Sequence, residues 1–158
     1  MRIQRATVDD ASEILALQKL AYQSEAEISG TYDIPPLTQT LREMEDDLER
    51  QVVLKIVHAT GPAGPAIIGS ARAYEEQGTC HIGRLIVHPD HQNQGLGTRL
   101  LAEIETAFPQ VERYELFTGH KSARNLYLYG KLGYKEFKRE TVSEGLAIVF
   151  LEKTRPER

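Results

Sequence analysis

The chain has 158 residues, of which 41% are hydrophobic and 27% charged, with a formal net charge of -4 and one cysteine, Cys80. This length suits one domain with one hydrophobic core, so we expect residues 1–158 to form a single domain. No apolar run approaches the roughly 20 residues that span a bilayer, and the first residues lack the apolar segment of a secretory signal. A lone cysteine forms no intrachain disulfide, and the acidic balance argues against binding nucleic acid. We therefore expect a cytoplasmic protein without membrane contact.

Hydrophobic periodicity and turn residues predict an alternation of strands and helices along the chain. The predicted elements are a strand at Ile3–Ala6, a helix from the Thr7/Asp10 capping box through Tyr22, an irregular stretch to Leu37, a helix containing Leu41, Met44 and Leu48, strands at Val52–Ala59, Ala66–Tyr74 and Cys80–Val87, a helix ending at Phe108, a strand at Tyr114–Thr118, a helix at Ser122–Leu132 and strands at Tyr134–Thr141 and Leu146–Glu152. A Gly/Pro turn at residues 61–65 predicts an antiparallel hairpin. This order predicts an α+β domain with one mixed, mostly antiparallel sheet flanked by helices. Its exposed C-terminal edge strand would suit a homodimer.

The most informative segment is His81–Leu101, HIGRLIVHPDHQNQGLGTRLL, in which an apolar strand leads through a glycine-containing loop into a helix. Backbone N–H groups of such a loop and of the first helical turn favour negative charge, so the segment suits a pyrophosphate. A dinucleotide-binding fingerprint would require glycine or alanine at Leu100, and a Walker loop would require Lys-Ser/Thr where Thr98-Arg99 stands. Neither alternative fits.

The remaining pattern is Gln-x-x-Gly-x-Gly directly after Leu-Ile-Val-His-Pro, which closely resembles the acetyl-CoA signature of the GNAT superfamily of N-acetyltransferases. A second block, SARNLYLYGKLGY at residues 122–134, resembles the superfamily's Asn-x-x-x-Tyr helix that closes on Lys-x-Gly-Tyr/Phe. The resemblance implies a GNAT-like fold, an acetyl-CoA-binding core at about residues 66–135, and acetyl-CoA and an amine acceptor as partners. It implies coenzyme contacts at Leu85, Ile86, Val87, Gln92, Asn93, Gln94, Gly95, Leu96, Gly97, Thr98, Asn125 and Tyr129.

The resemblance also implies direct attack of an amine on the acetyl thioester, with backbone N–H groups of Val87 and its neighbours stabilising the oxyanion. Tyr129 stands where the superfamily places its general acid, and a phenol with a pKa of about 10 is protonated at neutral pH. Asn125 and Tyr129 are four residues apart and share one helix face, so Asn125 could hold the pantetheine arm. We assign Tyr127 and Tyr134 to core packing.

The identity of the general base is left open by the sequence. Many superfamily members carry a glutamate in the strand before Leu-x-Val-x-Pro, where this chain has His81. Histidine, with an unperturbed pKa of about 6.5, is suited to accept a proton at physiological pH. Glu75, Glu76 or a water relay are the alternatives.

The remaining histidines do not predict a metal site. His88, His91 and His120 lack zinc-ligand spacing and Cys80 has no companion cysteine, so we expect no metal. We expect His88 and His91 to be exposed beside the loop.

Acceptor specificity is expected in residues 22–50, the least patterned part of the chain. Glu25, Glu27 and Asp33 could attract a cationic amine there, although plain surface acidity is the better explanation of these residues. The sequence leaves the acceptor unidentified. It also leaves open an acyl-CoA-binding module without turnover, which the missing strand glutamate would fit, and an acetyltransferase acting on protein or RNA-bound amines.

Overall fold

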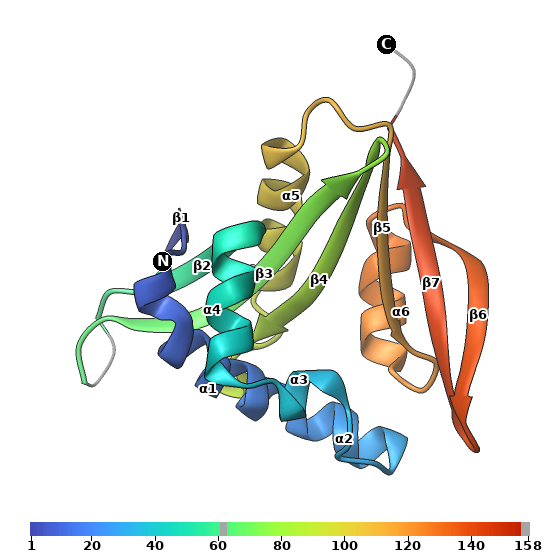
Figure 1. Cartoon of the computed structure of the whole chain (residues 1–158), viewed down its shortest axis with the longest axis horizontal. Helices are drawn as coiled ribbons and strands as arrows, with labels where there is room; N and C mark the ends of the chain where they lie inside the picture. Colours follow the sequence, from blue (N-terminus) through green and yellow to red (C-terminus); the bar gives the residue numbers. More distant parts are fainter. Residues whose placement is uncertain (61–62, 156–158) are drawn as a thin grey trace.

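Alternating apolar side chains build a single mixed sheet, with strand order β1-β2-β3-β4-β5-β7-β6 (Figure 1). The computed structural model describes residues 1–60 and 63–155. The elements are β1 (Arg2–Arg5), η1 (Val8–Asp10), α1 (Ala11–Ala21), α2 (Gln23–Ser29), α3 (Pro35–Thr38), α4 (Leu41–Arg50), β2 (Val52–His58), β3 (Ala66–Glu76), β4 (Thr79–Val87), η2 (Pro89–His91), α5 (Leu96–Ala107), β5 (Arg113–Gly119), α6 (Ala123–Lys131), β6 (Lys135–Ser143) and β7 (Leu146–Thr154). The predicted fold class is confirmed.

The prediction of an irregular stretch before residue 37 is wrong, because two short helices, α2 and α3, occupy it. Gly30 ends α2 with a left-handed φ of 81°, and Pro35 begins α3, where its fixed φ and missing N–H cost nothing. Helices of this length show too few turns for periodicity to reveal them. The predicted turn at residues 61–65 lies partly outside the described residues, and β2 and β3 pair antiparallel as predicted.

Two hydrophobic cores lie on opposite faces of the sheet. Helices α1 and α4 cover one face of β2–β4 and α5 covers the other, as Figure 1 shows. The α5 core includes Ile56, Leu100, Leu101, Ile104 and Val149, all less than 2% exposed. The α1 core is smaller and is centred on Ile14 and Met44.

The sheet is divided between β4 and β5. These parallel strands pair only where they begin, at Thr79–His81 against Arg113–Glu115. Figure 1 shows that they separate toward their other ends. Residues 82–87 of β4 therefore have no strand partner on the β5 side within the described chain. The backbone groups of this part of β4 are therefore not used in pairing with β5.

The C-terminal half of the sheet ends in β6, whose residues are all exposed, so the predicted exposed edge strand is present. None of the helices in the described part of the chain has both the length and the apolar character to cross a membrane.

Candidate active site

The glycine-containing loop has the backbone conformation of an anion-binding concavity. Asn93 and Gly95 adopt left-handed φ values of 63° and 78°, and α5 begins directly after Gly95. The Arg99 N–H donates to the Gly95 carbonyl (3.1 Å), which begins the helical ladder. The N–H groups before Arg99 precede that ladder and point out of the helix end.

Side chains hold this loop between β4 and α6. The Gln92 Nε2 donates to the Val87 carbonyl (3.3 Å), and Arg124 of α6 donates to Gln92 Oε1 and to Asn93 Oδ1. Gly97 has a packing role as well, because a Cβ there would lie 3.4 Å from the Leu128 side chain. The loop is therefore fixed to α6.

Other residues around the loop contribute mainly to the cores. The Leu96 side chain is buried, Thr98 is half-buried, and Gln94 is exposed. Within β4, Ile86 packs in the α1 core, whereas Leu85 and Val87 pack against the α5 core. The backbone of these β4 residues, rather than their side chains, borders the split.

Tyr129 is buried without a hydrogen-bond partner for its hydroxyl among the described residues, which is unusual for a buried tyrosine. Tyr134, whose ring centroid is 6.2 Å away, is equally buried, but its hydroxyl donates to Glu105 Oε2 (2.9 Å). Burial raises the pKa of Tyr129, and Tyr22 and Glu25 raise it further. Tyr129 is therefore a neutral phenol with a proton available to a ligand.

Glu25 connects α2 with the helix that carries Tyr129. It accepts from Ser122 Oγ (2.7 Å) and from Asn125 Nδ2 (3.3 Å), and Asn125 also donates to Thr118 Oγ1 (3.2 Å). Glu27 and Asp33 are exposed, so the structure brings only Glu25 of the three acidic residues to the site.

The assignment of Tyr127 to core packing is wrong, because its side chain is 73% exposed. Tyr127 precedes Tyr129 by two residues on the same helix, so the two side chains lie on different faces of that helix. Tyr134 packs in the core as predicted.

His81 lies in the paired part of β4, where the split begins. Its ring stacks on Tyr74, with centroids 5.1 Å apart, and its Nδ1 is 3.7 Å from Glu115 Oε2. Glu75 and Glu76 lie beside the β3–β4 turn, and Glu75 accepts from Gln110 Nε2 (2.8 Å). His81 is thus nearer to the split than either glutamate along the sheet.

The remaining cysteine and histidine side chains of the region pack within the fold. Burial raises the pKa of the Cys80 thiol to about 12, so the thiol is unreactive at neutral pH. The expectation that His88 and His91 are exposed is wrong: both are half-buried, and the His91 ring meets His58 and His88 edge to face. Within residues 1–60 and 63–155 no group of three or more His, Cys, Asp or Glu side chains could hold a metal ion.

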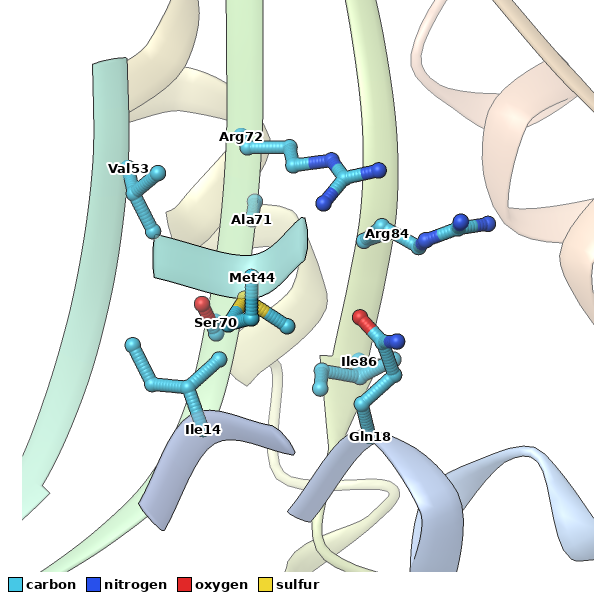
Figure 2. Close-up of a pocket in the computed structure, with 9 residues that line it drawn as sticks. All are labelled: Ile14, Gln18, Met44, Val53, Ser70, Ala71, Arg72, Arg84 and Ile86. Carbon is cyan, nitrogen blue, oxygen red and sulfur yellow. The ribbon is translucent and has the colours of Figure 1, made fainter. Parts of the chain in front are cut away.

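A group of polar side chains that the sequence did not predict lies beneath α1 and α4 (Figure 2). Arg72 of β3 forms an ion pair with Asp47 of α4, and Arg84 of β4 lies beside them, as does the buried Gln18 of α1. One signal was available: Arg84 is a charged residue in the middle of the apolar strand segment CHIGRLIV.

A concavity of backbone N–H groups next to a split sheet fits a ligand that has a pyrophosphate and an extended arm, as in acyl-CoA-dependent transferases. The chain belongs to the GNAT acetyltransferase family, since residues 36–155 match the family model "Acetyltransferase (GNAT) domain". The predicted family is confirmed.

The chain is also similar to one curated protein and to several solved structures. UPF0157 protein YqkA of Bacillus subtilis (strain 168) is 28% identical over 138 residues, which are 87% of this chain but only 38% of that relative. The PaiA N-acetyltransferase from Thermoplasma acidophilum, solved in complex with coenzyme A, superimposes with a TM-score of 0.77 at 15% identity over 98% of each chain. The ribosomal-protein-S18-alanine N-acetyltransferase from Escherichia coli gives a TM-score of 0.72 at 18% identity over 97% of this chain and 92% of that one. At these identities the two structures support the fold.

Proposed function

We propose that this chain is an acetyl-CoA-dependent N-acetyltransferase that acts on a primary amine. Acetyl-CoA supplies an acetyl thioester. Transfer of its acetyl group to an amine yields an amide and the free thiol of coenzyme A. The observation that carries the proposal is the hydroxyl of the buried Tyr129, which has no hydrogen-bond partner among the described residues and lies on the helix whose Arg124 is bonded to the anion-binding loop.

The loop and the split fit the donor. Left-handed backbone at Asn93 and Gly95 presents N–H groups to a pyrophosphate, and residues 92–98 would hold it. The β4 backbone at Leu85–Val87, which has no strand partner on the β5 side within the described chain, would bind the arm and the thioester oxygen, with Asn125 on the α6 side. These residues lie within the predicted coenzyme core at residues 66–135.

Tyr129 is proposed as the general acid that gives its O–H proton to the departing sulfur. Because burial raises its pKa, the phenol stays protonated through the physiological range. Its proton would be regained from solvent after each turnover.

His81 is proposed as the base. An amine with a pKa of about 10.4 is neutral only about once in 2,500 molecules at pH 7, so a proton acceptor or a water relay is required. His81 Nδ1 faces Glu115, which can stabilise the imidazolium that forms. If His81 is the base, His81→Ala should lose the acidic limb of the kcat/KM profile; a retained limb would assign the role to another group.

The test of the proposed function is release of coenzyme A from acetyl-CoA across a broad amine panel, with Tyr129→Phe and Tyr134→Phe compared. Amine-dependent release that collapses in Tyr129→Phe and persists in Tyr134→Phe is expected. Coenzyme binding without release for any amine, including protein N-termini and lysines, would favour a binding module instead.

A further inference from the structure

A small cavity lies between α1, α4 and the sheet, on the side that faces the predicted acceptor region. Its volume of about 10 Å³ is enough for one water molecule or a small polar group. Figure 2 shows the residues that line it: Ile14, Gln18, Met44, Val53, Ser70, Ala71, Arg72, Arg84 and Ile86.

Two buried polar atoms in this lining have no hydrogen-bond partner within the described chain, Gln18 Oε1 and Arg84 Nε. Gln18 is 1% exposed, and its Nε2 donates to the Pro36 carbonyl (3.0 Å) and to Gln39 Oε1 (2.8 Å), which fixes the orientation of the amide. A buried polar group without a partner is destabilising, so its retention indicates a polar occupant. The cavity thus offers one donor and one acceptor to a ligand.

The same lining has more positive than negative charge. Arg72 is paired with Asp47, which also accepts from Gln39 Nε2 (2.6 Å). Arg84 forms no ion pair with any carboxylate of the described residues. Burial and the neighbouring Arg84 charge lower the pKa of Arg72, and Asp47 opposes that shift. Of the two guanidinium groups, only that of Arg72 is paired with a carboxylate of the described residues. A carboxylate supplied by a ligand could pair with Arg84.

The backbone at Arg84 is held in an unfavourable conformation that aims this side chain. Ser70 pairs with Ile86 and Arg72 with Gly83, so Arg84 and Leu85 oppose Ala71 alone in a β-bulge. Arg84 has a left-handed φ of 49°, which is costly for a residue with a Cβ. In Figure 2 the Arg72 and Arg84 side chains extend from their strands to the same side. Such strain at a non-glycine residue is typical of functional positions.

Tyr22 connects this arginine pair to the proposed acetyl-transfer site. Tyr22 is half-buried, and burial raises its pKa, with Glu25 adding to the increase and the Arg84 and Arg72 charges opposing it. Tyr22 and Glu25 in turn act on Tyr129. Glu25 also accepts a hydrogen bond from Asn125, one helical turn before Tyr129, so Tyr22 and Glu25 connect Arg84 with the helix of the proposed acid.

We infer that the acceptor is a small amine that also carries a carboxylate, such as an amino acid, whose carboxylate binds Arg84 while its amine lies near Glu25 and Tyr129. This inference rests on the proposed function and narrows its substrate class. Gln18 Oε1 would accept a hydrogen bond from the bound molecule or from a water beside it.

The test compares matched acceptors, namely amino acids, their carboxamides and their decarboxylated amines. Charge-assisted bonds to Arg84 predict a kcat/KM for the acids about 10- to 100-fold above that for the amides. Arg84→Asn, which tolerates the left-handed backbone, should abolish this preference by lowering kcat/KM for the acids more than for the amides. Arg42→Gln, which removes an exposed charge from α4, is the matched control and should keep it.

Each outcome decides the inference. Equal rates with acids and amides in the wild type, or a preference that survives in both Arg84→Asn and Arg84→Gly, would overturn it. If no amine is acetylated at all, the proposed function fails, and binding decides the inference separately. In that case thermal stabilisation of the coenzyme A-loaded protein by acids but not by amides, lost in Arg84→Asn, supports the carboxylate site, and its absence refutes the site.

Discussion

The anion-binding loop and the arginine-lined cavity are built in opposite ways. The loop consists of consecutive residues whose backbone does the binding, with left-handed Asn93 and Gly95 before the start of α5. The cavity is lined by side chains of five elements, α1, α4, β2, β3 and β4. The difference predicts that the loop is sensitive to changes of backbone conformation, whereas the cavity is sensitive to loss of single polar groups.

The largest effect is expected at Tyr129, on the helix whose Arg124 is bonded to the loop. Tyr129→Phe should lower kcat by about 10² to 10⁴ if its hydroxyl is the acid. Tyr134→Phe removes an equally buried hydroxyl that is bonded to Glu105, so it should cost about 1 kcal/mol of stability and leave kcat unchanged. Steady-state rates and denaturant unfolding of both variants measure this contrast, and equal rates for the two would remove the catalytic role.

The pH dependence sharpens the same assignment. Burial raises the pKa of Tyr129, so its required protonated form persists above the ordinary phenol pKa of about 10. Its contribution to stability is fully present below about pH 10 and is lost as the pH rises through the folded pKa. We expect kcat to show no alkaline limb from Tyr129 below about pH 10; a limb near pH 8 that Tyr129→Phe removes would contradict the proposal.

The fold should lose stability when Asp47, the carboxylate that pairs with Arg72 beside the arginine-lined cavity, is removed. Asp47→Ala leaves Arg72 and Gln39 without their partner, and we expect a loss of about 2 to 3 kcal/mol in the free energy of unfolding. Asp46→Ala on the same helix removes an exposed carboxylate and should stay within about 0.5 kcal/mol of the wild type. Urea unfolding measures both, and similar losses would mean that the Asp47 pair is not special.

The loop should respond to backbone conformation rather than to side chains. Gly95 has open space where a Cβ would be, so Gly95→Ala acts through its left-handed φ and should raise the KM for acetyl-CoA about 10-fold. Gln94→Ala, one residue earlier and exposed, should change it less than about twofold. A larger effect from Gln94→Ala would show that the loop binds through side chains.

This difference in construction also explains what the sequence could predict. The loop, the α6 block and most strands follow from local spacing, because their residues are neighbours in the chain. Glu25 and Ser122 are 97 positions apart, and no periodicity connects them. Gln18, Asp47, Arg72 and Arg84 likewise meet only through strand register and helix packing. The wrong assignment of Tyr127 to the core could have been avoided from the sequence. Two residues two positions apart on a helix lie on different faces, so Tyr127 and Tyr129 cannot both face the core.

The smallest expected effect distinguishes a functional Arg84 from a structural one. Left-handed backbone costs a residue with a Cβ about 1 to 2 kcal/mol, and glycine is entropically less favourable in the folded state by about 0.5 to 1 kcal/mol. Arg84→Gly also removes a guanidinium that has no ion pair within the described chain. It should therefore keep or raise the free energy of unfolding, by up to about 1 kcal/mol.

The control for this change is Arg42→Gly, the same chemical change in the regular helix α4, which should lower stability by about 1 kcal/mol. Denaturant unfolding of both variants gives the comparison. A higher free energy of unfolding for Arg84→Gly together with a lower one for Arg42→Gly would mean that the fold does not require Arg84. It would support a role of Arg84 in binding a ligand. A clear loss of stability in Arg84→Gly would instead make the arginine a structural part of the bulge, and the cavity beside it a packing defect rather than an acceptor site.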